Sequence, residues 1–233
     1  MVLFPFALSG CNPGAAQDTY VVQITTDMSP HVVQLNQEVW KNGSHTFQPV
    51  LSLKFPRAYY NYRDNQDGYR QTVVGLSLNK QTLGPLALDL ARQVGKTDQT
   101  QLLRAHQRNA ANEILVTLGA GSTGPGFSPR SAYTPDRRIG SWEGFDIYRP
   151  RVPRPAQPRC SNSPVCQFGE EIEGVTPVGE PMNLECVARS GICSISFAYG
   201  EAIVELFVPA AEVARATELR SSVLNLLNSH RVK

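Results

Sequence analysis

Short runs in which apolar and polar residues alternate are the feature that most restricts the fold of this chain. Leu51, Leu53 and Phe55 alternate with polar neighbours in residues 50–55, and residues 71–78 repeat the pattern. A period of two places the apolar side chains on one face of a strand, which is typical of an antiparallel sheet with one buried side. Further apolar runs predict strands at 20–24, 113–118, 142–148 and 202–208.

Helical spacing of apolar residues appears in three other places. Residues 31–40 have apolar positions 32, 35 and 39, and helical character returns at 98–112. Pro209 suits the first turn of a last helix, whose apolar stripe comprises Val213, Ala216, Leu219, Val223, Leu226 and Leu227. These patterns predict an α+β fold with helices packed on one face of antiparallel sheet. Two related strand-strand-helix units and one continuous sheet both fit.

The N-terminus is a short apolar run that ends in Leu8-Ser9-Gly10-Cys11. This tetrapeptide resembles the lipobox of bacterial lipoproteins. The resemblance implies that residues 1–10 are a lipoprotein signal segment, that Cys11 carries a diacylglyceryl group, and that residues 11–18 form a tether. No Lys or Arg precedes the run, which is near the lower limit of about seven residues for a signal segment, and a start codon placed too far downstream explains both. The rival interpretation is a buried N-terminal strand.

The other four cysteines, Cys160, Cys166, Cys186 and Cys193, lie in the last third of the chain. An even number in an exported protein predicts two disulfides, with three connectivities allowed. A turn-forming Arg-Ser-Gly separates the two apolar runs around Cys186 and Cys193, so these cysteines are expected to face each other across a hairpin. We therefore favour Cys186 with Cys193 and Cys160 with Cys166. A zinc site would need C-x-x-C spacings, which are missing here.

Composition within the chain predicts its division into units. Residues 119–141 are rich in Gly, Pro and Ser and predict a loop. Prolines recur in residues 149–158, where they exclude a helix or an inner strand, so this segment is interpreted as a connector. The connector separates an N-terminal α+β unit, residues 19–148, from a C-terminal disulfide-braced α+β unit, residues 159–233.

Charge and motifs exclude several classes of function. The chain has 22 Lys and Arg against 20 Asp and Glu, which is far from the basic excess that nucleic-acid binding requires. Asp64-Asn-Gln-Asp-Gly68 resembles half of a calcium loop, but the Glu that would complete it is missing, so a polar turn is favoured. The four histidines have no metal-ligand spacing. We expect no metal and no cofactor.

The stretch Gly119-Ala-Gly-Ser-Thr-Gly124 satisfies G-x-G-x-x-G and approximates a nucleophile elbow around Ser122. Both mechanisms need a helix directly afterwards, and Pro125-Gly-Phe-Ser-Pro129 cannot begin one. A serine hydrolase that uses Ser122 with His230 or His106 as its base is kept as a third hypothesis of function. The favoured reading is a loop without catalytic activity.

Residues 57–70 hold four of the eight tyrosines of the chain together with three arginines. Tyr and Arg are enriched at the energetic centres of protein interfaces. The alternative, that the tyrosines extend a strand and pack on the core, stays open. The predicted partner-binding residues are Tyr59, Tyr60, Tyr62, Arg63, Asp64, Asp67, Tyr69 and Arg70.

The order of these features resembles type VI secretion immunity lipoproteins. It comprises an apolar strand, Pro56-Arg-Ala-Tyr-Tyr-Asn-Tyr62, a polar turn, a second strand, Gly144-Phe-Asp-Ile-Tyr148, and a paired-cysteine hairpin before a C-terminal helix. Such proteins bind and neutralise periplasmic toxic effectors, notably lipases. The resemblance implies a lipid-anchored binding protein without enzymatic activity that faces the periplasm, and Asn12 after Cys11 implies sorting to the outer membrane. A structural or assembly lipoprotein of the envelope is the alternative.

Overall fold

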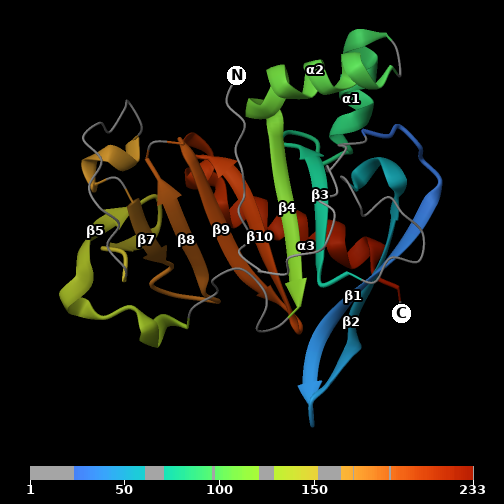
Figure 1. Ribbon diagram of the computed structural model, residues 1–233. Coiled ribbons are helices and arrows are strands. Elements are labelled where there is room, and N and C mark those ends of the chain that lie inside the picture. Colours follow the sequence, from blue (N-terminus) through green and yellow to red (C-terminus); the bar gives the residue numbers. More distant parts are fainter. Residues whose placement is uncertain are drawn as a thin grey trace, which may run out of the picture.

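The computed structural model describes residues 24–60, 71–95, 98–120, 129–151, 164–169, 171–188 and 190–232. Within them, β1 (Pro30–Lys41) and β2 (Ser44–Pro56) form a two-stranded antiparallel sheet. A second sheet has eight strands and is accompanied by three α-helices (Figure 1). The predicted α+β fold with antiparallel sheets is therefore confirmed.

The eight-stranded sheet is antiparallel throughout and takes strands from both sides of residues 149–158. Its order is β3 (Val73–Asn79), β4 (Glu113–Ala120), β10 (Ala202–Pro209), β9 (Ile192–Tyr199), β8 (Met182–Val187), β7 (Glu171–Val175), β6 (Phe145–Tyr148) and β5 (Arg138–Trp142). Because β4 pairs with β10 and β6 pairs with β7, the observed arrangement is the continuous sheet rather than two separate ones. Residues 152–158 of the expected connector lie outside the described residues.

One face of this sheet forms the core. Leu76, Val116, Leu206, Ile195 and Leu184 lie opposite one another in the register of five neighbouring strands, and all are fully buried. Similar rows lie on either side of this one. The period-two patterns of the sequence correspond to this single buried face.

Two elements cover the buried face. The 3-10 helix η8 (Ala210–Arg215) leads into α3 (Ala216–His230), and Leu219, Val223 and Leu227 of α3 are buried in the core, as the predicted apolar stripe requires. The base of the two-stranded sheet joins the same core, where the ring of Phe55 stacks on that of His230 with centroids 4.0 Å apart.

The other two helices lie beside the β3 end of the sheet (Figure 1). α2 (Gln99–Asn109) falls within the predicted helix at 98–112 and continues into the 3-10 turn η3 (Ala110–Asn112). α1 (Leu86–Val94) has no counterpart among the predictions. It begins after Pro85 and ends at Gly95, which has the left-handed conformation that favours glycine at a helix end. Both helices pack on each other through Leu90 and Leu102 in a small core of their own.

The prediction of a helix at 31–40 is wrong, because this segment is β1. His31, Val33 and Leu35 are buried and alternate as in a strand, whereas Val32 is 54% exposed, and Asn36 is also buried at the point where the register shifts. The helical spacing was based on positions 32, 35 and 39, and of these only Leu35 is buried in the core. Pairing with β2 along the whole segment outweighs that local pattern.

The structure also corrects several boundaries. β5 begins inside the predicted loop at 119–141, which contains the short 3-10 turns η5 (Arg130–Ala132) and η6 (Pro135–Arg137) as well. The strand expected at 142–148 is divided by a turn at Glu143 and Gly144, both with positive φ. Ile24 is not in a strand, and 20–23 lie outside the described residues. Further short elements are β7, which was not predicted, and the 3-10 turns η1 (Arg57–Tyr59) and η7 (Pro164–Gln167).

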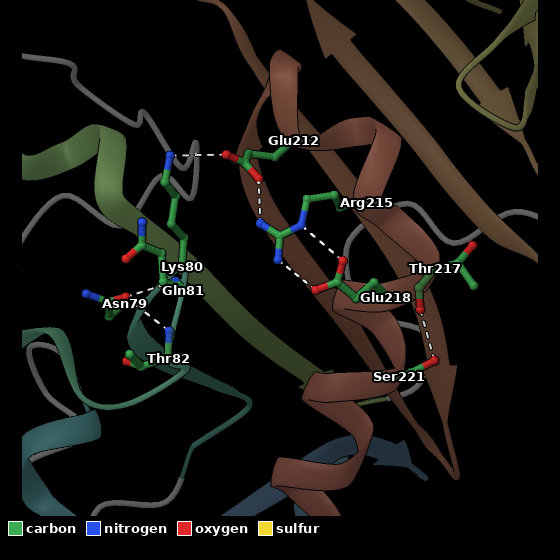
Figure 2. A network of polar contacts seen from close by, with 9 residues as sticks. All are labelled: Asn79, Lys80, Gln81, Thr82, Glu212, Arg215, Thr217, Glu218 and Ser221. Carbon is green, nitrogen blue, oxygen red and sulfur yellow. Dashed lines mark hydrogen bonds and ion pairs between the residues drawn. The ribbon is translucent and has the colours of Figure 1, made fainter.

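A polar network ties the turn after β3 to η8 (Figure 2). Lys80 Nζ lies 3.1 Å from Glu212 Oε1, and Arg215 binds the other oxygen of Glu212 at 3.0 Å and both oxygens of Glu218. The hydrogen bond from Lys80 is the main reason why the pKa of Glu212 lies below its ordinary value. The network links the β3 edge of the sheet to the C-terminal helix from outside the apolar core.

We expect Leu206→Ala to lower the free energy of unfolding by about 2–5 kcal/mol, because it opens a cavity in the buried row across the sheet. Val73→Ala, at a position that is 46% exposed on the edge strand β3, should change it by less than about 0.5 kcal/mol. Urea unfolding of both variants measures the difference. Equal losses of unfolding free energy in the two variants would show that this row is not central to the stability of the core.

Candidate functional site

The two-stranded sheet continues beyond the body of the protein as a hairpin, comprising residues 37–48, which we name the arm (Figure 1). Its register is regular from Gln37 opposite Gln48 to Lys41 opposite Ser44. Asn42 and Gly43 form the connecting turn, and both have positive φ. An Asn-Gly turn of this kind matches the right-handed twist of the strands, so it holds the two strands of the arm in register.

The arm rises from a base that is fixed in the core. Leu35, Leu51 and Leu53 are buried there, whereas the side chains of the arm are half-buried or exposed. The register shifts between Leu35 and Asn36, which lie opposite Leu51 and Pro49, and this leaves Val50 as an extra residue. A bulge of this type redirects a ribbon. Here it marks the point where the ribbon leaves the core.

One side of the arm carries three rings. Trp40 is 71% exposed, and its ring stacks on His45 with centroids 4.8 Å apart. His45 in turn lies 4.8 Å from the ring of Phe47, and its Nε2 is 3.5 Å from a carboxylate oxygen of Glu38. Strand alternation and register place these four side chains, which we name the aromatic face, on the same side of the ribbon.

A tryptophan this exposed on a projecting ribbon is a typical anchor for a binding partner. Large aromatic side chains supply much of the binding energy at protein interfaces, and soluble proteins seldom expose them in groups. The formal charges of the arm, those of Glu38 and Lys41, cancel. The arm therefore offers apolar area and hydrogen-bonding edges rather than electrostatic attraction.

The arm was missed in the sequence because residues 31–40 had the spacing of a helix. A local signal was nevertheless present, since Asn42-Gly43 is flanked by Val39 and Trp40 on one side and by Thr46 and Phe47 on the other. Asn-Gly between short runs of strand-forming residues is a strong hairpin signal.

The predicted Tyr/Arg stretch is only partly described. Tyr59 is half-buried beside the rings of Phe55 and His230, and burial raises its pKa. Tyr60 is 2% exposed and packs in the core, where its hydroxyl accepts a hydrogen bond from the backbone N–H of Phe55. Tyr60 is therefore a core residue and not the surface anchor that was expected. The other predicted contacts lie outside the described residues: Tyr62, Arg63, Asp64, Asp67, Tyr69 and Arg70.

The cysteine predictions concern the opposite part of the sheet. Cys186 and Cys193 form a disulfide between directly opposed positions of β8 and β9, as predicted. Cys166 is disulfide-bonded as well, and its expected partner Cys160 lies outside the described residues, as does Cys11. A buried disulfide across a hairpin is typical of proteins in an oxidising compartment.

The two candidate bases of the hydrolase hypothesis are both engaged in other contacts. His230 stacks on Phe55, and its Nδ1 lies 3.0 Å from the carbonyl oxygen of Leu226. His106 Nε2 lies 2.8 Å from Glu113 Oε2. Ser122 lies outside the described residues. In the part of the chain that the structure describes, His, Cys, Asp and Glu residues nowhere gather in threes as a metal site.

Ser77, Glu113 and His106 form a polar cluster that joins β3, β4 and α2. Ser77 Oγ donates a hydrogen bond of 2.5 Å to Glu113 Oε1, and His106 contacts the other oxygen of the same carboxylate. In a catalytic triad the imidazole takes the proton of the serine, but here the carboxylate lies between them. The arrangement therefore suits a structural contact between the helix and the sheet better than nucleophilic catalysis.

This cluster should make stability depend on pH. The hydrogen bond to Glu113 raises the pKa of His106 against the effect of burial. Burial alone would raise the pKa of Glu113, but its bonds to His106 and Ser77 and the charge of His106 hold it below the ordinary value. The contribution of His106 is complete below its unfolded pKa of 6.5 and is lost as the pH rises through the higher folded value. The contribution of Glu113 to stability is complete above its unfolded pKa of 4.5, and it is lost as the pH falls through the lower folded value.

We therefore expect His106→Gln to destabilise the protein by on the order of 1 kcal/mol near pH 5.5 and by clearly less near pH 8.5. His45→Gln is the matched control, since the contact of His45 with Glu38 lies on the exposed arm and its loss should change the melting temperature little. Calorimetric melting of both variants at the two pH values measures the difference. A loss from His106→Gln that is independent of pH would contradict the coupling.

Comparisons with known proteins add little. No protein family model matches the sequence, and no curated protein matches it at a significant level. The immunity protein Smlt3025 of the Stenotrophomonas maltophilia type IV secretion system aligns at 13% identity, with 87% of this chain and 95% of that chain covered and a TM-score of 0.49. The iron-regulated outer membrane lipoprotein FrpD of Neisseria meningitidis aligns at 10% identity over 84% and 92%, with a TM-score of 0.41. Both scores are below 0.5, so neither likeness carries an argument about function.

Among the helices of the described ranges, none combines the length and the apolar character that a bilayer span requires.

Proposed function

We propose that this chain is a binding protein of the bacterial cell envelope that faces the periplasm, is tethered to the outer membrane by lipid on Cys11, and neutralises a toxic effector of a type VI secretion system, such as a lipase. The observation that carries the proposal is the exposed Trp40 on an arm that projects from a fixed base. The partner in this proposal is another protein, without a nucleic acid or a cofactor.

The shape and chemistry of the arm suit an inhibitor. Active sites are concave, and those that bind acyl chains are lined with apolar side chains. A narrow ribbon that carries Trp40 and Phe47 on one side and no net charge can enter such a cleft and exclude the substrate. Because the arm is held by the core at its base and by a tight turn at its tip, little conformational freedom is lost when it binds.

The polar cluster of Ser77, Glu113 and His106 supports a binding function better than a catalytic one. The nearest approach to a triad has the order Ser77, Glu113, His106, in which the base cannot reach the hydroxyl through the carboxylate. The rest of the Tyr/Arg stretch is proposed as a second contact area, comprising Tyr59, Tyr62, Arg63, Asp64, Asp67, Tyr69 and Arg70.

The proposal is tested by directing the toxic product of the neighbouring gene to the periplasm and measuring growth. The wild-type chain should restore growth, and Trp40→Ala should abolish protection, because losing an interface anchor weakens binding by about 2 kcal/mol or more. The melting temperature should stay near wild type, since the Trp40 side chain is largely exposed.

Val178→Ala is the control for this experiment. Val178 is 78% exposed between β7 and β8, away from the arm, so its loss should leave protection intact. Full protection by Trp40→Ala would remove the arm from the proposal. Failure of the wild-type chain to protect would favour a structural or assembly lipoprotein.

The lipid anchor has a separate test. Cys11→Ser should abolish membrane association and leave the domain folded, because the proposed anchor is covalent and residues 12–18 are predicted to be a tether. Labelling with a radioactive fatty acid should therefore be confined to the wild type, with the melting temperature of both proteins as the control. Equal labelling of the variant would show that Cys11 is not the lipidated residue.

A further inference from the structure

The turn at the tip of the arm is built from a chemically reactive dipeptide. Asn42-Gly43 is the only Asn-Gly in the sequence. Asparagine is a thermolabile residue, because the backbone nitrogen of the next residue can attack its side-chain carbonyl carbon. Attack is easiest when the next residue is glycine, which has no Cβ to crowd the nitrogen. The dipeptide that forms the tight turn is therefore also the Asn-X pair of this chain with the most favourable neighbour for attack.

The surroundings of the turn leave the reacting atoms open. Asn42 and Gly43 are both exposed. Within the described parts of the chain, nothing forms a hydrogen bond with the side-chain amide of Asn42 or with the N–H of Gly43. Apart from the adjoining residues, no heavy atom lies within 4 Å of the place that a Cβ of Gly43 would take. Neither reacting group has to lose a side-chain partner first.

The other asparagines of the described residues lack this combination, since none of them is followed by glycine. Asn225 lies inside α3 and precedes a leucine. The rest have side-chain amides that form hydrogen bonds, and they are Asn36, Asn79, Asn109, Asn112, Asn183 and Asn228. The position of the reaction is therefore singled out by both sequence and structure.

The reaction needs only water. The nitrogen of Gly43 loses its proton and forms a bond with Cγ of Asn42, while the side-chain amino group takes up a proton and leaves as ammonia. Water then opens the resulting succinimide ring at one of its two carbonyls. Opening at Cγ gives aspartate, and opening at the backbone carbonyl gives isoaspartate, in which the main chain runs through Cβ and Cγ. Both products have a carboxylate in place of the amide.

The folded turn slows the first step. Asn42 has a φ of 50°, and in the left-handed conformation Cβ lies almost opposite the next nitrogen across the Cα–C bond. Ring closure requires rotation about this bond, which opens the turn and the pairing of Lys41 with Ser44. Such local opening costs least at the tip of a two-stranded ribbon outside the core. The rate is therefore set by opening of the arm and not by global unfolding.

The isoaspartyl product does not fit the arm as it stands. It adds one main-chain atom to a turn of two residues, and loop length determines the turn type of a hairpin. Trp40 and His45 form the pair next to the turn pair, and the stack of their rings at 4.8 Å depends on this register. The new carboxylate also gives a net negative charge to an arm in which Glu38 and Lys41 otherwise cancel.

We propose that Asn42 is a deamidation site, at which a succinimide formed with Gly43 when the turn opens yields isoaspartate and disrupts the aromatic face. The modification is a property of the chain alone and does not depend on the proposed function. Its effect on a bound effector does rest on that function, because the modified arm no longer presents Trp40 in the same register. The arm then has a limited lifetime as a binding element.

Incubation of the purified Cys11→Ser chain at neutral pH, followed by peptide mass spectrometry and labelling with isoaspartyl methyltransferase, tests the site. The peptide that contains Asn42 should gain the mass difference between amide and acid and become methylated. Its rate should rise with pH, because the attacking nitrogen must lose its proton. Asp67-Gly68 can form isoaspartate without this gain in mass, so the two peptides are mapped separately.

Asn42→Gly is the matched control. A Gly-Gly pair also suits a two-residue hairpin turn, but it has no side chain that can cyclise. This variant should therefore show neither the mass gain nor methylation at position 42. In a Trp142→Phe background, the fluorescence of Trp40 should shift on ageing with Asn42 present and stay constant in Asn42→Gly. Fresh Asn42→Asp has the new charge on a normal main chain and should keep the initial fluorescence.

A synthetic peptide of residues 37–48 tests the role of the fold, because it needs no opening of the arm. It should react faster than the folded chain, and equal rates would show that the turn does not protect Asn42. Three further outcomes would overturn the proposal. These are an unmodified Asn42 in the chain after the peptide has reacted completely, aspartate without isoaspartate, and unchanged Trp40 fluorescence after modification. Each measurement uses the chain alone, so its failure is distinguishable from failure of protection in the periplasm.

Discussion

The pairing of β4 with β10 is the contact on which the rest of the structure depends. It joins strands from the two halves of the sequence, and it places Val116 beside Leu206 and Leu118 beside Val204. Without it, β3 and β4 would be a two-stranded ribbon with too little apolar surface to be stable. With it, eight strands share one buried face, which α3 and the base of β1 and β2 cover. The fixed base of the arm is therefore a consequence of a long-range strand pairing.

This dependence explains how the protein can expose a tryptophan. An isolated hairpin with Trp40 near its tip would exchange between several conformations in water. Here the same two strands contribute Leu35, Leu53 and Phe55 to the core before they reach the surface. The core determines the direction of the ribbon, and the arm keeps its form without burying its own side chains. The buried core residues and the exposed aromatic side chains thus lie at different ends of the same strands.

The sequence predicted those parts of the fold that are encoded locally. The alternation of apolar and polar residues predicted the strands around Leu53 and Leu76, and the short turn between Cys186 and Cys193 predicted their disulfide. The sequence pattern could not predict that β4 lies beside β10, because no local period encodes a contact between distant segments. The arm was not predicted for a different reason. Val32 completed the helical spacing of apolar residues at 31–40, but its side chain is exposed and takes no part in the core. The surface position expected for Tyr60 was wrong, because the burial of a side chain depends on its neighbours in the tertiary structure.

The arm exposes two kinds of surface, its side chains and its backbone edge. Side chains at Trp40, His45 and Phe47 point to one side of the ribbon, whereas the backbone groups of Glu38 and Trp40 point along its edge. Edge pairing and contact through the aromatic face are therefore compatible in geometry.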